Sequence, residues 1–308
     1  MRLASDAATS AGAATGADKD ERMPDPLTTP AAELPVRRLG PEDLSRCLAL
    51  SEDRAWAREE RKWLFLLENA EVYAIDAPSG DLAGTVTLTR YGTAAAGIGM
   101  MLVATRYGGR GLGRRLMTHV LDAAGDATVF LWATEFGRPL YEKLGFEALG
   151  VTEARVGRLR AGHDPVLSRP ADLDADLGAL LALDGEVFGA DRADLLARLF
   201  AFAEEVRVTE DETGLTGYAV SWRSVDTLFI GPVVADGEAV ARALVTDLAR
   251  KAGGLVRIEA ERARPGLLDW LGERGLSQAF STSFMVHGGR PVPGDRTRMF
   301  APMMLAMG

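Results

Sequence analysis

Cysteine and histidine are scarce in this chain of 308 residues, which contains one cysteine, Cys47, and three histidines. A single cysteine excludes an internal disulfide and a cysteine-rich metal site, and the three histidines are too dispersed to indicate a metal site. This usage fits a reducing compartment, and we expect the protein in the cytoplasm.

Long apolar stretches and an excess of positive charge are also missing. The first 33 residues are rich in Ala, Thr, Ser, Asp and Pro, without the apolar segment of a signal peptide or a membrane span. We therefore expect residues 1–33 to be a disordered tail and the protein to have no membrane partner. The formal net charge of −9 argues against a general affinity for nucleic acid and mildly favours cationic or neutral partners.

The remaining composition is that of an ordinary globular protein, with 47% hydrophobic and 26% charged residues. The length favours two domains over one. In the first half, apolar periodicity and turn residues predict helices that precede and interrupt a set of strands. The expected helices cover about 44–50, 56–68, 112–120 and 139–143, and the expected strands 72–75, 82–89, 98–103, 129–132 and 146–156. This order predicts an α/β fold of the α+β kind, in which helices flank a central mixed sheet.

The second half repeats the order of the first half at nearly the same spacing. The matching segments are 81–88 with 214–221, 97–101 with 229–233, and 140–146 with 270–276. Three ordered matches favour a duplicated domain over chance similarity of apolar segments. We expect one domain at 34–160 and a second at 161–308, with a closing strand of the second copy at 298–307.

A glycine-rich loop with the sequence Arg-Tyr-Gly-Gly-Arg-Gly-Leu-Gly covers residues 106–113, between a predicted strand and a predicted helix. Glycine lets the backbone approach a ligand closely, and the free N–H groups and dipole of a helix N-terminus attract an anion. Four arginines lie within ten residues: Arg106, Arg110, Arg114 and Arg115. They indicate a multiply charged anion such as a pyrophosphate, and therefore a nucleotide-type cofactor. The alternative is a tight turn followed by solvated arginines.

Two other phosphate-binding motifs do not match this loop. A Walker loop ends in Gly-Lys-Ser/Thr, and a dinucleotide-binding fold begins with a parallel βαβ unit followed by an acidic residue. The loop here lies in the middle of a domain, after strands joined by a hairpin.

With this loop and a second motif about 30 residues later, residues 35–158 resemble the GCN5-related N-acetyltransferase (GNAT) family. The loop is similar to the family's Gln/Arg-x-x-Gly-x-Gly/Ala motif, which cradles the pyrophosphate of acetyl-CoA. Arg106, Gly109 and Gly111 satisfy this motif literally. Aligned on the helix start, Gly111 and Gly113 take its last positions and Gly108 replaces Gln/Arg, which leaves Arg106 or Arg110 to supply the side-chain contact. The resemblance implies acetyl-CoA as co-substrate, held by Leu102, Val103, Arg106, Gly108, Gly109, Arg110, Gly111, Leu112, Gly113 and Arg114.

The second motif, Pro139–Phe146, is similar to the tyrosine-bearing helix of the family. In the family, the acceptor amine attacks the thioester directly in a ternary complex. The resemblance implies that backbone N–H groups at Leu102 and Val103 hold the thioester oxygen. It also implies that Tyr141 protonates the leaving thiolate, which suits a phenol of pKa about 10. The alternative for Tyr141 is a core tyrosine that anchors its helix.

The general base and the acceptor pocket stay open at this level. Glu135 follows the predicted strand at 129–132, on the acceptor side of this fold, while Glu59 and Glu60 lie in the helical region that usually covers the acceptor. Each acid could instead be a solvated surface residue. Four aromatic residues could line the acceptor pocket or belong to the core: Trp56, Trp63, Phe65 and Trp132.

The second copy has acidic residues and one glycine in Val234–Arg242, where the first copy has its loop, and Leu271 opposite Tyr141. Repulsion argues against a pyrophosphate there, so we expect this copy to be inactive toward acetyl-CoA. It would wall the acceptor pocket, close the sheet of the first copy or form a homodimer surface. The leading hypothesis is an N-acetyltransferase acting on a primary amine of a small molecule or peptide. The alternatives are a non-catalytic acyl-CoA-binding regulatory protein and a partner-binding module without cofactor.

Overall fold

The computed structural model describes residues 30–160, 162 and 165–307. Most of the predicted tail, residues 1–29, lies outside this part of the chain. The last residues of the predicted tail, Ala31–Glu33, form a short 3-10 helix, η1, beside α3. Ala31 and Leu34 pack against the hydrophobic core there.

The first half has the predicted order of elements. Its elements are β1 (Arg37–Arg38), η2 (Pro41–Asp43), α1 (Leu44–Asp53), α2 (Glu60–Asn69), β2 (Glu71–Asp76), β3 (Leu82–Tyr91), β4 (Ala95–Val103), η3 (Thr105–Tyr107), α3 (Leu112–Ala124), β5 (Thr128–Ala133), α4 (Arg138–Glu142) and β6 (Phe146–Gly157). Gly145, between α4 and β6, has a φ of +89°, which suits glycine at the end of a helix.

The second half repeats this order after a short strand. Its elements are β7 (Arg169–Pro170), α5 (Leu173–Phe188), α6 (Ala193–Phe202), β8 (Glu205–Asp211), β9 (Gly214–Ser224), β10 (Thr227–Ala235), α7 (Glu238–Ala249), β11 (Leu255–Glu261), α8 (Pro265–Glu273), β12 (Leu276–His287), η4 (Arg296–Arg298), β13 (Met299–Ala301) and η5 (Leu305–Met307). Within the described residues, no helix is long and apolar enough to cross a bilayer.

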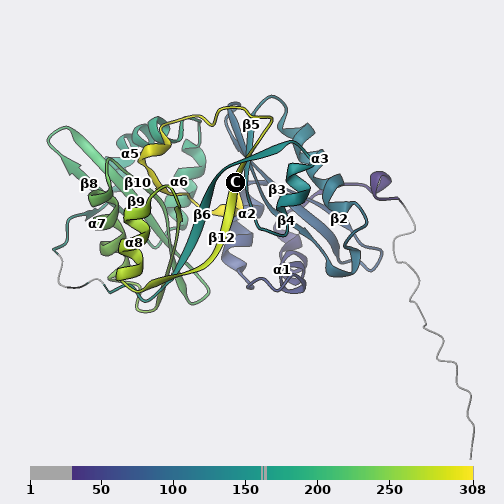
Figure 1. The fold of residues 1–308 in the computed structure, drawn as a ribbon, viewed down its shortest axis with the longest axis horizontal. Coiled ribbons are helices and arrows are strands. Elements are labelled where there is room, and N and C mark those ends of the chain that lie inside the picture. The colour runs from purple at the N-terminus through teal and green to yellow at the C-terminus, as the bar shows by residue number, and fades with distance from the viewer. Residues whose placement is uncertain (1–29, 161, 163–164, 308) are drawn as a thin grey trace, which may run out of the picture.

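The two halves share one continuous sheet because they exchange a strand. The strand order is β1-β2-β3-β4-β5-β12-β6-β11-β10-β9-β8-β7, so β12 pairs with β5 of the first half and β6 pairs with β11 of the second half. Figure 1 shows the halves side by side, with β6 and β12 passing between them. The second copy therefore closes the sheet of the first copy, one of the three roles considered for it. The domain boundaries, 34–160 and 161–308, stay a prediction.

Each half contains a pair of parallel strands that diverge. β4 and β5 pair only from Ala95 to Ile98 on β4, and β10 and β11 pair only from Thr227 to Ile230 on β10. Beyond these pairs, the first half has a bulge at which Met100 adopts a φ of +42°. In the second half, β13 pairs with β10 at Val233 and Val234 and also contacts β11. We call the opening between β4 and β5 the first splay and the opening between β10 and β11 the second splay.

The predicted closing strand at 298–307 is only partly correct. Only Met299–Ala301 form a strand, and Pro302, which has no N–H group, follows it. The next residues leave the second half, and η5 contacts β3, β4 and β5 of the first half. The Tyr91 hydroxyl donates to the Met307 carbonyl at 2.9 Å.

The hydrophobic core also joins the halves. One core contains residues from α1, α2 and β2–β5 together with residues from α5, α6, β8 and β9, while a second lies between α7, α8 and the strands β10 and β11. At the junction, Arg192 donates to Asp184 at 2.7 and 2.8 Å, and both side chains are almost fully buried. The Tyr218 hydroxyl donates to the same carboxylate.

Candidate functional site

The glycine-rich loop leads directly into the N-terminus of α3. Gly109 and Gly111 have φ values of +73° and +82°, in the left-handed region that side-chain-bearing residues avoid. Gly111 is the N-cap of α3, and no side chain in the described part of the chain caps this helix. The amide groups of the first turn therefore face a space without a capping side chain, which is the geometry of an anion site.

Gly113 allows α3 to approach the first splay and α4 closely. A Cβ on Gly113 would lie 3.1 Å from the Leu140 side chain on α4 and 3.2 Å from the Met101 side chain on β4. Gly113 thus brings the start of α3, the outer part of β4 and the tyrosine-bearing α4 together. Leu102 and Val103 pair with β3 but not with β5. The backbone edge of β4 that faces the first splay therefore has no partner strand at these residues.

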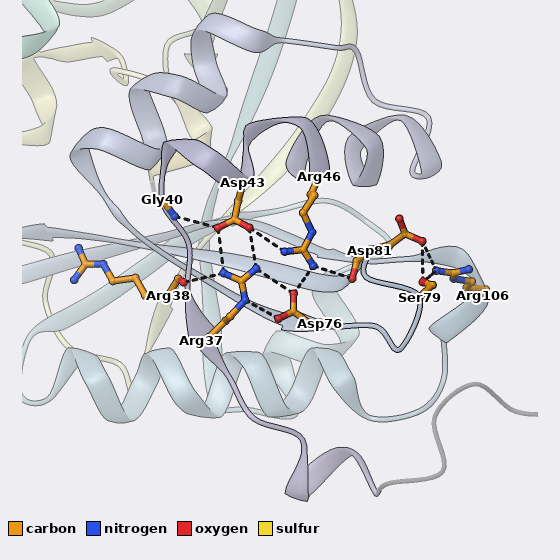
Figure 2. A network of polar contacts seen from close by, with 9 residues as sticks. All are labelled: Arg37, Arg38, Gly40, Asp43, Arg46, Asp76, Ser79, Asp81 and Arg106. Carbon is orange, nitrogen blue, oxygen red and sulfur yellow. Dashed lines mark hydrogen bonds and ion pairs between the residues drawn. The ribbon is translucent and has the colours of Figure 1, made fainter.

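The arginines near this loop lie in different environments. Arg106 donates to Ser79 and Asp81 at 2.8 Å each, and Figure 2 shows it turned toward this turn before β3. Arg110 lies over the buried Tyr107 ring, 5.8 Å from its centroid. Arg114 is exposed on the first turn of α3. The predicted contact of Arg106 with an anion would require it to leave Asp81.

Tyr141 lies on α4 with its ring against the backbone of Gly137, where a Cβ would approach the ring within 2.9 Å. The side chain is 8% exposed, and burial raises the pKa of its hydroxyl to about 12. The phenol is therefore protonated at neutral pH, as a proton donor must be.

Glu135 is exposed in the turn after β5. The next residue, Phe136, is 85% exposed, and Arg54 at the end of α1 lies 5.4 Å from the centroid of its ring. Arg54 also donates to Thr105 at 3.2 Å, after β4. The connection between α1 and α2 thus reaches both strands of the first splay.

Glu59 and Glu60 differ strongly although they are neighbours. Glu60 is exposed, whereas Glu59 is largely covered and accepts a hydrogen bond from the Ser224 hydroxyl of the second half at 2.6 Å. Burial opposes ionisation of Glu59, but Lys62, Ser224 and Arg257 together lower its pKa. Glu59 is therefore an ionised carboxylate held by both halves, a link that the sequence did not indicate.

The four aromatic candidates for the acceptor pocket separate into two groups. Trp63 is fully buried and donates to Ser51 at 2.9 Å, and Phe65 is buried, so both belong to the core. Trp56 is 40% exposed, and Trp132 is half-buried with its indole N–H donating to Thr152. Only these last two keep surface that a ligand could reach.

The second copy differs from the first at each corresponding position. Gly237 is the N-cap of α7, and Glu238 follows it in the first turn of the helix. In the first copy, the corresponding position is where we predict the anion to bind. Leu271, opposite Tyr141, is fully buried. The second splay already contains β13. Three differences therefore argue against a second acetyl-CoA site in this copy: the acidic first turn of α7, the lack of a hydroxyl at Leu271, and the presence of β13 in the second splay.

Comparisons with known families agree for both halves. The model of the acetyltransferase (GNAT) family matches residues 41–146, and the model of an acetyltransferase (GNAT) domain matches residues 180–301. A protein of Bacillus subtilis, named uncharacterized N-acetyltransferase YitH, is 29% identical over 246 residues, which cover 78% of this chain and 86% of the relative.

Solved structures share the fold over most of the chain. A putative acetyltransferase from Pyrococcus horikoshii superposes with a TM-score of 0.76 at 20% identity, covering 89% of this chain and 96% of the other. A tandem GNAT protein from the clavulanic acid biosynthesis pathway superposes with a TM-score of 0.59 at 15% identity, covering 84% and 99%. These likenesses confirm the predicted mixed α/β fold and its tandem arrangement.

Proposed function

The chain belongs to the GNAT family of acetyltransferases, with one copy of the domain in each half, and on this premise we propose that its first copy transfers an acetyl group from acetyl-CoA to a primary amine. The transfer would occur by direct attack of the amine in a ternary complex. The observation that carries the proposal is the uncapped N-terminus of α3, which Gly113 brings close to β4 and to α4, the helix that carries the buried Tyr141.

The residues present suit acetyl-CoA. The positive φ of Gly109 and Gly111 turns the loop into the helix, and no atom of the described residues, apart from the chain neighbours, lies within 4 Å of a Cβ on Gly109. Amide groups from Gly109 to Arg114 would hold the pyrophosphate, with Arg110 and Arg114 adding positive charge. Successive N–H groups of a strand alternate between its two edges, and the Ala104 N–H donates to Ala83 of β3, so Val103 rather than Leu102 would present its N–H group to the thioester oxygen.

Acetyl-CoA supplies an activated acyl group and a thiolate that must be protonated when it leaves. Tyr141 is a suitable donor because burial keeps its hydroxyl protonated well above neutral pH. Burial also shields the hydroxyl from hydrogen bonds to water, which supports a role in proton transfer.

Glu135 and Glu59 are the candidates for accepting the amine proton. Glu135 lies next to the end of β5 and is open to solvent, so it could accept a proton from an incoming ammonium through water. Glu59 is paired with Lys62, which lowers its basicity. We therefore assign the base to Glu135 and a positioning role to Glu59.

The proposal can be tested by substituting Tyr141→Phe. In an enzyme, this variant should keep its affinity for acetyl-CoA, measured by calorimetry, and lose about 10²- to 10⁴-fold in CoA release with an accepted amine from a library of primary amines. Unchanged turnover would remove Tyr141 from the mechanism. Binding of acetyl-CoA without turnover of any amine by the wild type would point instead to a non-catalytic acyl-CoA-binding regulator.

A further inference from the structure

Residues 302–307, which we call the C-terminal segment, carry the chain from the second splay to the first. The segment begins after β13 and ends in η5 against β3, β4 and β5. The Leu305 backbone lies close enough to the Glu259 carboxyl of β11 to counter part of the rise in its pKa that burial causes, and the Thr87 hydroxyl donates to the Ala306 carbonyl at 3.1 Å. The segment thus lies near residues of both halves of the protein.

Gly99 places the segment at the point where the first splay opens. It is the first residue of β4 beyond the last pair with β5, and a Cβ there would lie only 1.9 Å from the Ala306 carbonyl oxygen. This close approach requires a glycine. Gly99 pairs with Thr87 and so shares its face of the sheet.

The face that carries the C-terminal segment is opposite to α3. On β3, Gly84 points toward α3, because a Cβ there would lie 3.0 Å from the Leu116 side chain. Thr87 is three residues further along the same strand and therefore points to the other face. If the pyrophosphate is held at the start of α3, an acceptor that meets the acetyl group through the splay must approach from the side of the segment.

Part of the C-terminal segment is accessible there. Leu305 and Ala306 are half-buried, whereas the methionines before and after them are buried. Gly99 on β4 and Trp132 on β5 are half-buried as well. The accessible surface at the splay therefore includes residues of both strands and of the segment.

We propose that Leu305 and Ala306 are specificity-determining residues of the acceptor site, where they contact the group that carries the acceptor amine. The inference rests on the proposed transferase function of the first copy. All six residues from Pro302 to Met307 are apolar. The class of acceptor that fits this wall is a primary amine on an aliphatic chain, and the second copy contributes to the site through β13, from which the segment continues.

The first test uses straight-chain and branched primary alkylamines as probes. Leu305→Ala should raise kcat/KM for branched relative to straight-chain amines by about tenfold or more, because a change of one or two methylenes in an apolar site alters selectivity by roughly 10- to 200-fold. Its acetyl-CoA affinity should equal that of the wild type. Leu173→Ala, at a partly exposed leucine of α5, is the matched control and should change neither quantity. An unchanged ratio in Leu305→Ala would overturn the inference.

A second test needs no amine. Leu305→Cys adds a thiol to a chain whose own Cys47 is buried. With bound acetyl-CoA, the introduced thiolate would attack the acetyl carbonyl carbon, the bond from that carbon to the CoA sulfur would break, and the CoA thiolate would take up the proton released by the cysteine thiol.

Mass spectrometry would detect the resulting S-acetylcysteine. The inference predicts faster acetylation in Leu305→Cys than in Leu173→Cys, and suppression of the difference by excess free CoA. Equal rates in a protein that binds acetyl-CoA would overturn the inference alone. Absence of acetyl-CoA binding by the wild type in calorimetry would refute the proposed function and the inference with it.

Discussion

Replacement of Gly109 by alanine tests the anion site at the start of α3 with little disturbance of packing. The residue has a φ of +73°, and apart from its chain neighbours no described atom lies within 4 Å of the added Cβ. A left-handed backbone costs an L-residue about 1–2 kcal/mol, so the free energy of unfolding should fall by about that amount. The added methyl group would hinder the close approach of an anion to the loop backbone. Loss of one charge-assisted hydrogen bond there costs about 1.5–3 kcal/mol, which corresponds to roughly 10- to 150-fold in Kd.

The assay combines calorimetric titration with acetyl-CoA and thermal unfolding. Gly253→Ala is the matched control, since Gly253 has a φ of +62° in open space but lies in the second half. Both variants should lose stability to a similar degree, and only Gly109→Ala should lose affinity for acetyl-CoA. Equal affinities in the two variants would refute the assignment of the anion site to this loop.

Three further predictions concern the scaffold. Arg192→Leu leaves the buried Asp184 carboxylate without its cationic partner, although the Tyr218 hydroxyl still donates to it, and should lower the free energy of unfolding by about 3–5 kcal/mol in urea titrations, part of which a second substitution, Asp184→Leu, should restore. Hydrogen bonds from Arg37 lower the pKa of Asp43 to about 2, so the ionised carboxylate stabilises the fold above about pH 4 and this contribution disappears as the pH falls toward 2. The stability difference between wild type and Asp43→Asn should therefore narrow over that range in urea titrations at each pH. Burial raises the pKa of the Cys47 thiol to about 12, so iodoacetamide should modify it only after denaturation, and labelling of the native protein at neutral pH would contradict its burial.

Local sequence patterns predicted most elements of the first half. Apolar spacing located α3, and glycine marked the end of α4, where Gly145 has the expected left-handed backbone. The exchange of β6 and β12 was not predictable in this way. The pattern of residues 276–287 indicates a strand but does not specify which strand it pairs with, because pairing depends on contacts distant in sequence. The fate of residues 302–307 escaped prediction for the same reason.

The candidate site shows the same limit at the level of side chains. The clustered arginines indicated an anion, yet Asp81, from the turn before β3, binds Arg106 in the structure. The sequence left Trp63 as either a pocket or a core residue and Glu59 as one candidate base among several, and it did not indicate that Ser51 binds Trp63 or that Ser224 binds Glu59. Glycine near a helix start is a strong local signal, whereas partners that come from another part of the chain leave no local signal.

The central claim is that the first copy binds acetyl-CoA and the second copy does not. The stoichiometry of acetyl-CoA binding tests this claim most directly. Calorimetric titration of the wild type should give one site per chain, and a variant with Gly111 and Gly113 changed to bulkier residues should give none. Two sites per chain, or one site that persists in this variant, would contradict the account and place acetyl-CoA in the second copy.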